Sequence, residues 1–121
     1  MRLYQEALAD LGDELSLLTE GPGRRSSYHL LVARLRGGAE RRRRVFEELQ
    51  RAGIRPQVHY IPVHLQPWYQ KHAPFRRGDF PRAEAYYQGC VSLPLFPRMA
   101  DADVVRVAAA LRAALKNVPV Q

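Results

Sequence analysis

Residues 53–69 read GIRPQVHYIPVHLQPWY and form the most chemically specific stretch of the chain. The run holds two histidines, three aromatic residues and three prolines. After Pro56 the side chains alternate as in a strand, with His59 and Tyr60 on opposite faces. Pro62 ends this strand, because proline has no N–H to donate to a neighbouring strand. We therefore expect His59, Tyr60 and His64 at the C-terminal edge of this strand, a common position for ligand-binding groups.

The residues after Pro62 predict a different structure. Residues 63–69 cannot continue a regular strand and read as a turn into a short aromatic helix. Pro67 suits the first position of that helix, where the missing N–H would have no partner within the helix in any case.

Hydrophobic periodicity places the other elements on both sides of this stretch. We expect helices over residues 2–11, 39–52, 81–90 and 103–116, and further strands over residues 27–35 and 91–95. Residues 12–25 are irregular, and Pro94 and Pro97 favour a sheet edge for the last strand. The elements predict an α+β fold, a small and mostly antiparallel sheet of about three strands with helices packed on it.

The same patterns predict which sides of the helices are buried. The four arginines at 41–44 fall on the polar face of their helix, where we expect a solvated surface. Asp101 is expected to cap the last helix. The buried side is expected to hold Ala83, Tyr86, Tyr87 and Cys90 in helix 81–90, and Val104, Ala108, Leu111 and Leu115 in helix 103–116.

Length and composition predict one soluble domain. A chain of 121 residues with 46% hydrophobic residues can bury one modest core. No apolar run is long enough to span a bilayer, and charged residues interrupt the first turns, so we expect a cytoplasmic protein. Cys90 is the single cysteine and is expected to be a buried thiol.

The net charge of +7 raises the possibility of a nucleic-acid partner. The cations are scattered apart from residues 41–44, and successive helical residues point about 100° apart, so this run cannot face one phosphate track. The pattern therefore argues against nucleic acid as the main partner.

Metal binding and hydrolytic chemistry find no support in the sequence. His59 and His64 are separated by four residues, and neither His29 nor His72 stands in a ligand spacing with them. No glycine-rich phosphate loop and no nucleophile motif is present.

Three motifs occur in one order along the chain. Ser27-Tyr28-His29-Leu30 comes first, VHYIPVHLQP follows at residues 58–67, and SLPLFPRM lies at residues 92–99. Together they resemble the C-terminal domain of the DegT/DnrJ/StrS-type nucleotide-sugar aminotransferases, over about residues 3–115. Residues 58–67 look most like the aminotransferase of pseudaminic acid biosynthesis, which aminates a UDP-linked 4-keto-6-deoxy sugar.

The resemblance implies a domain organisation. Residues 1–12 correspond to a truncated interdomain helix, and residues 13–121 to the small domain of a fold-type I pyridoxal phosphate (PLP) transferase. It also implies that His59 and Tyr60 face the sugar-nucleotide pocket, supported by His29 from the neighbouring strand. His64, Pro67, Trp68 and Tyr69 are expected to shape the adjoining loop.

The family's cofactor is PLP, held on a lysine of the large domain with an acidic partner for the pyridine nitrogen. Lys71 and Lys116 are the two lysines of this chain, and neither lies in the family's lysine motif. The resemblance thus implies that this chain binds no cofactor, that it needs the missing large domain, and that glutamate is the amino donor of the whole enzyme.

Two alternatives remain open. The chain could be a free-standing binding module without catalysis, in which case exposed apolar surface on the first helix and on the face that would meet the large domain would favour a homodimer. It could also be a basic RNA-binding domain, although its aromatic residues form no recognisable stacking platform.

Overall fold

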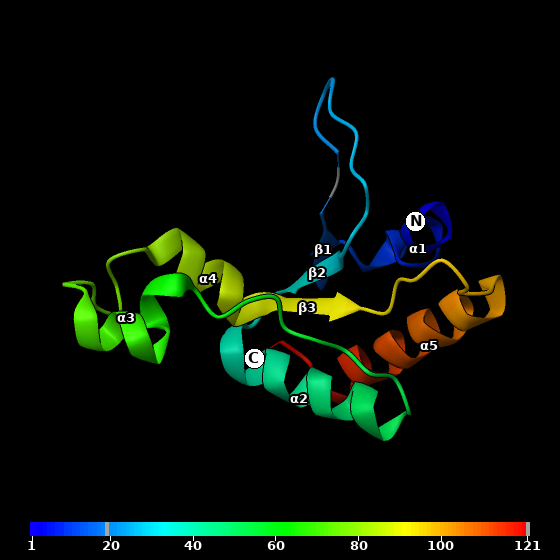
Figure 1. The fold of residues 1–121 in the computed structure, drawn as a ribbon. Helices are drawn as coiled ribbons and strands as arrows, with labels where there is room; N and C mark the ends of the chain where they lie inside the picture. The colour runs from blue at the N-terminus through cyan, green and yellow to red at the C-terminus, as the bar shows by residue number, and fades with distance from the viewer. Residues whose placement is uncertain (19, 121) are drawn as a thin grey trace.

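A computed structural model describes residues 1–18 and 20–120 and shows a three-stranded antiparallel sheet at the centre of the fold (Figure 1). Thr19, within the predicted irregular segment, and Gln121, at the end of the predicted small domain, lie outside the described residues. The strands are β1 (Leu15–Leu17), β2 (Leu31–Leu35) and β3 (Cys90–Leu93). Leu35 pairs with Leu15, and Leu31 pairs with Leu93, which makes β2 the central strand.

The predicted fold class is confirmed, but one strand comes from another part of the chain. The strand expected after Pro56 is wrong, because the structure gives this segment a single bridge, between Gln57 and Ser92. The third strand is β1, within the segment predicted to be irregular. Three residues are too few for an alternation of apolar and polar side chains to be recognised in the sequence. This strand forms because Leu15 is buried opposite Leu35.

Helices account for most of the remaining chain. They are α1 (Arg2–Ala7), α2 (Gly38–Arg51), α3 (Pro67–His72), α4 (Pro81–Gly89) and α5 (Asp101–Asn117), with 3-10 turns η1 (Ala9–Leu11) and η2 (Val63–Leu65). Pro67 stands at the start of α3 as predicted. Within residues 1–18 and 20–120, none of these helices combines the length and apolar character needed to cross a bilayer.

The ends of two helices show how local chemistry sets their bounds. Gly53 follows α2 with φ +73°, and the next N–H, on Ile54, donates to the Leu49 carbonyl at 2.9 Å, a common helix ending. The predicted cap Asp101 is wrong, because Ala100 occupies the cap position of α5. The Asp103 carboxylate accepts the Ala100 N–H at 2.9 Å, so an acidic residue one turn later stabilises this end.

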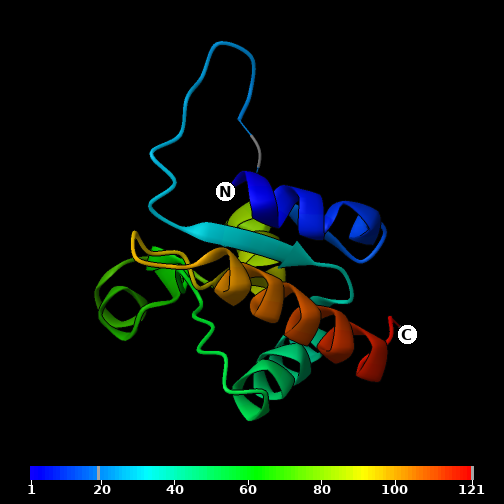
Figure 2. The ribbon, with the colours of Figure 1, turned by 90° about the vertical axis from the view of Figure 1, so that its right-hand side faces the viewer.

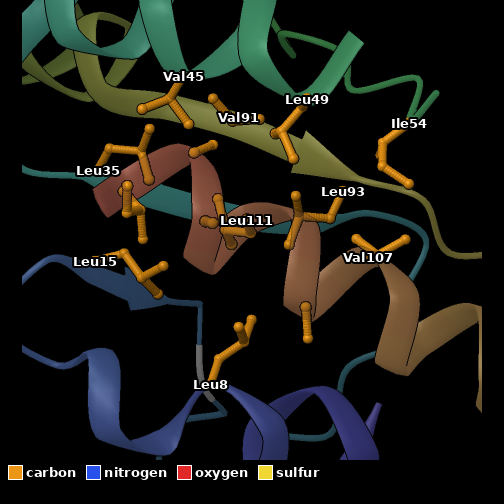
Figure 3. Packing of buried hydrophobic residues seen from close by; sticks show 14 of the residues in the cluster. Leu8, Leu15, Leu35, Val45, Leu49, Ile54, Val91, Leu93, Val107 and Leu111 are labelled. Atoms are coloured by element: carbon orange, nitrogen blue, oxygen red, sulfur yellow. The ribbon is translucent and has the colours of Figure 1, made fainter. Parts of the chain in front are cut away.

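The core lies between the sheet and two helices. Figure 3 shows Val45 and Leu49 of α2 and Val107 and Leu111 of α5 pointing towards side chains of β2 and β3. The predicted buried side of α5 is confirmed at all four positions, Val104, Ala108, Leu111 and Leu115. On its other side α5 contacts α1, so that α5 lies between α1 and α2 (Figure 2).

Burial along α4 differs from the prediction. Ala83 is exposed, Tyr86 and Tyr87 are half-buried, and Cys90 is buried at the start of β3. Glu84 is the buried residue of the first helical turns. The helix therefore turns a carboxylate inward, which the apolar pattern did not indicate.

Arg41 also departs from the prediction of a solvated arginine run. Arg41 is 5% exposed, and its guanidinium donates to the Val118 carbonyl at 2.7 Å and to the Arg36 carbonyl at 3.0 Å. A third bond joins it to the Glu14 carboxylate. One arginine of the run is therefore buried and links α2 to the end of α5 and to the residue before β1 by hydrogen bonds.

Candidate functional site

The segment that contains His59 runs along the free edge of β3. Gln57 and Ser92 exchange two backbone hydrogen bonds, of 3.0 and 2.8 Å. The side chain of His59 follows the same neighbour, since Nδ1 lies 2.8 Å from Ser92 Oγ. Three hydrogen bonds therefore hold residues 57–59 to one buried serine.

His59 and Tyr60 lie side by side at this edge. Their rings meet edge to face, with centroids 4.6 Å apart and an interplanar angle of 70°. His59 is half-buried, whereas Tyr60 is 67% exposed. Within residues 1–18 and 20–120, the structure gives no hydrogen-bond partner to His59 Nε2 or to the Tyr60 hydroxyl. This pair can offer two adjacent polar groups to an oxygen-rich ligand.

His29 lies at a different place. It is exposed just before β2 and lines a cavity of about 540 Å³ with Tyr28, Phe96 and other residues. Because Leu31 pairs with Leu93, His29 sits beyond the C-terminal end of β3. His59 lies near Cys90, at the opposite end of that strand. The structure thus brings His59 and Tyr60 together but leaves His29 apart from them.

The cavity beside His29 joins two of the sequence motifs. Ser27, Tyr28 and His29 face Leu95, Phe96 and Pro97 across it. Tyr28 has a φ of +49°, a left-handed conformation that is costly for a bulky residue. Its N–H donates to Ser26 Oγ at 3.0 Å, which helps to hold this conformation.

A buried contact between a histidine and a glutamate fixes the loop after the His59 segment. His64 Nε2 lies 2.8 Å from Glu84 Oε1, and both side chains are almost fully buried. The same carboxylate oxygen accepts the Gly78 N–H at 2.7 Å. The hydrogen bond from the Gly78 N–H lowers the pKa of the Glu84 carboxyl below its usual range, and the hydrogen bond with His64 lowers it further. No local pattern marks Glu84, because its partner His64 lies twenty residues earlier.

Aromatic residues surround this pair. Pro62, Val63, Tyr69, Phe75 and Phe80 line an apolar cavity of about 310 Å³ together with His64 and Ala83. Trp68 is 61% exposed and stacks on His72, with ring centroids 4.6 Å apart. Figure 1 shows α3 projecting away from α1 and α5.

The part of the prediction that placed exposed apolar surface on the first helix is wrong. On α1 and just after it, Tyr4 and Leu8 are buried, and Leu3, Ala7 and Leu11 pack against the core. Large exposed apolar side chains gather instead in residues 60–80, among them Tyr60, Val63 and Trp68.

Replacing Glu84 by glutamine is expected to lower the melting temperature near neutral pH. The pKa of Glu84 is lower in the folded chain than its ordinary value of 4.5, so its ionised form stabilises the fold above pH 4.5. This contribution is lost as the pH falls through the folded pKa. The gap between wild type and Glu84→Gln should therefore narrow below pH 4.5.

Melting curves recorded by circular dichroism between neutral and acidic pH test this expectation. Glu6→Gln removes an exposed glutamate from α1 and controls for the loss of one surface carboxylate. A gap between wild type and Glu84→Gln that stays constant down to acidic pH would show that the Glu84 charge does not stabilise the fold.

The two lysines lie outside these sites, whereas Cys90 lies beside the His59 backbone, with its Sγ atom 4.0 Å from the His59 carbonyl oxygen. Lys71 on α3 and Lys116 near the end of α5 are both exposed, and neither lines the cavity beside His29 or the cavity beside His64. Burial raises the pKa of the Cys90 thiol, as expected for an unreactive side chain. Among residues 1–18 and 20–120, no three histidine, cysteine or acidic side chains gather as a metal site would require.

Sequence comparison identifies relatives along nearly the whole chain. SpsC of Bacillus subtilis, a spore coat polysaccharide biosynthesis protein, is 34% identical over 117 residues, which cover 94% of this chain and 30% of SpsC. The dTDP-3-amino-3,4,6-trideoxy-alpha-D-glucose transaminase of Streptomyces venezuelae is 34% identical over 110 residues, covering 90% of this chain and 27% of that enzyme. The chain thus spans less than a third of the length of these relatives.

Structural comparison agrees with the sequence. The Streptococcus pneumoniae protein Spr1654, described as a sugar aminotransferase in its PMP form, superposes with a TM-score of 0.90 and 28% identity. The match covers 98% of this chain and 29% of Spr1654. The family model of the DegT/DnrJ/EryC1/StrS aminotransferases matches residues 1–112. The chain therefore belongs to the DegT/DnrJ/EryC1/StrS aminotransferase family.

Proposed function

We propose that this chain is the C-terminal small domain of a PLP-dependent enzyme that aminates a nucleotide-linked keto sugar. One observation carries the proposal: the family match extends over residues 1–112, although the chain covers only 30% and 27% of two relatives. A segment of this size supplies part of an aminotransferase. Its task is to form one wall of a composite site and to close that site against water, which would otherwise compete with the sugar.

The substrate class has two supports. The Streptomyces relative is named as a transaminase of a dTDP-linked deoxy sugar. Residues 58–67 carry the motif that resembles the aminotransferase of pseudaminic acid biosynthesis. We infer that the acceptor is a UDP-linked 4-keto-6-deoxy sugar, that glutamate is the donor and that the enzyme acts in the cytoplasm.

His59 and Tyr60 are the proposed contacts to the sugar nucleotide. Their rings touch, and His59 is held by Ser92 while its second ring nitrogen remains available. Phosphate and sugar oxygens accept hydrogen bonds from groups of this kind. His29, at the other end of β3, is a third candidate in its own cavity.

PLP does not fit the residues of this chain. A Schiff-base lysine has to lie in an enclosed site, whereas Lys71 and Lys116 are exposed on two separate helices. We therefore assign the cofactor to the large domain, which this chain must meet. The exposed apolar side chains of residues 60–80 favour a homodimer, in which such surface would be covered.

The DNA immediately upstream of the Met1 codon tests the domain assignment. We expect an in-frame large domain with its lysine, and the encoded protein should aminate a UDP-linked 4-keto-6-deoxy sugar with glutamate in the presence of PLP. A stop codon with no such domain nearby would contradict the assignment and would favour a free-standing binding module.

Replacing His59 by alanine in that enzyme is expected to lower kcat/KM for the sugar about 10-fold, the equivalent of about 1.4 kcal/mol for one lost hydrogen bond. The conversion of glutamate in the absence of the sugar should stay unchanged, because His59 is assigned to the sugar side. His72→Ala, which removes an exposed histidine stacked on Trp68, is the matched control. Equal kinetics for wild type and His59→Ala would remove His59 from the site.

A further inference from the structure

Ser92 bonds to the segment that contains His59 through both its backbone and its side chain. It is 4% exposed, and both of its backbone hydrogen-bonding groups are bonded to Gln57. Its side chain lies 2.8 Å from His59 Nδ1. Within residues 1–18 and 20–120, the structure gives the hydroxyl no other partner.

The burial of this hydroxyl decides how the hydrogen bond is oriented. A buried O–H that donates to nothing is costly, because its interaction with water is lost and not replaced. His59 Nδ1 is the acceptor within reach. A neutral imidazole carries one proton, so a ring that accepts at Nδ1 must carry its proton on Nε2.

We propose that Ser92 is a positioning residue that fixes both the orientation and the tautomer of the His59 ring. The hydroxyl donates to Nδ1, and His59 then presents Nε2–H as a donor at the edge of β3. Such a donor recognises an acceptor oxygen, as in a phosphate, a carbonyl or a sugar hydroxyl. The identity of that oxygen rests on the function proposed above, whereas the tautomer does not.

Nitrogen-15 NMR of the full 121-residue chain tests the tautomer without any ligand. Long-range proton–nitrogen spectra separate the protonated from the unprotonated ring nitrogen, and a His59→Gln variant assigns the signals. In an alkaline buffer, well above the ordinary pKa of an imidazole, we expect wild-type His59 to carry its proton on Nε2. Ser92→Ala should give a mixture of tautomers, and Ser92→Thr, which keeps a hydroxyl, should restore the wild-type signals.

Two results would overturn the proposal: a wild-type ring protonated on Nδ1, or His59 signals that are the same in wild type and Ser92→Ala. Melting curves of both Ser92 variants ensure that the comparison is between folded chains. If Ser92→Thr does not fold, Ser92→Cys offers a weaker donor in the same place.

Kinetics of the whole enzyme separate this proposal from the proposed function. Ser92→Ala should lower kcat/KM for the sugar by up to about 10-fold, because a mobile ring loses part of its hydrogen bond, and Ser92→Thr should recover most of it. If the NMR result holds but neither His59→Ala nor Ser92→Ala changes the kinetics, Ser92 positions the ring and the sugar contact is wrong. If the NMR result fails, Ser92 does not position the ring, whatever the enzyme aminates.

Discussion

Replacing Arg41 by alanine is expected to lower the free energy of unfolding by about 3 kcal/mol, one of the two largest effects that we predict. The guanidinium is almost fully buried and bonds to the Val118 carbonyl, the Arg36 carbonyl and the Glu14 carboxylate. Alanine removes all three bonds and leaves polar groups without their partner. It also removes the apolar stem of the side chain from the interior.

Urea denaturation followed by circular dichroism measures this loss. Arg41→Met keeps most of the stem and isolates the contribution of the hydrogen bonds. Arg43→Ala is the matched control on the same helix, because Arg43 is exposed and pairs with Glu40 and Glu47 at the surface. Surface pairs contribute little, so Arg43→Ala should change stability far less. A similar loss in Arg41→Ala and Arg43→Ala would contradict the buried role of Arg41.

The case of Arg41 shows what periodicity can and cannot predict. The apolar spacing of residues 39–52 and 103–116 predicted both long helices and the buried side of the second, because each pattern repeats over several turns. A guanidinium counts as polar in any such pattern. Its burial depends on acceptors from Glu14, Arg36 and Val118, which are brought to it by the tertiary fold.

The sheet shows the same division. The strand β2 lies within the predicted strand 27–35, whereas β3 begins at Cys90, one residue before the predicted strand 91–95, and ends at Leu93. The segment after Pro56 alternates like a strand, yet it pairs at Gln57 alone, since the chain turns into η2 after Pro62. β1 has too few residues to be recognised alone, and its pairing with β2 defines it.

For the candidate site, the sequence predicted which residues lie close together because they are adjacent in the chain. It did not predict the contacts between residues that are distant in the chain. His59 and Tyr60 are adjacent, so their proximity followed directly from their order. The contact of His59 with Ser92 joins residues 33 positions apart and needed the fold. The grouping of His29 with His59 assumed one strand end, whereas the strand register places them at opposite ends of β3.

Replacing Gly89 by alanine is the second change with a large expected effect, a loss of about 2 kcal/mol in the free energy of unfolding. Gly89 is buried at the end of α4, against the end of β2. A Cβ atom there would lie 2.6 Å from the Leu35 carbonyl oxygen and 3.4 Å from Arg34 Cγ. The carbonyl belongs to the central strand and cannot move without disturbing its pairing with β1, so α4 must shift instead.

Gly12→Ala separates this steric effect from the general effect of glycine on the unfolded chain. Gly12 has a φ of −56°, which alanine adopts readily, and a Cβ atom added there would meet no other atom within 4 Å among the described residues. Alanine there should stabilise the chain by about 0.5 kcal/mol, because it restricts the unfolded state without a clash. The two variants should therefore change stability in opposite directions in the same urea experiment. If Gly89→Ala were as stable as Gly12→Ala, the close approach of α4 to β2 at Gly89 would be wrong.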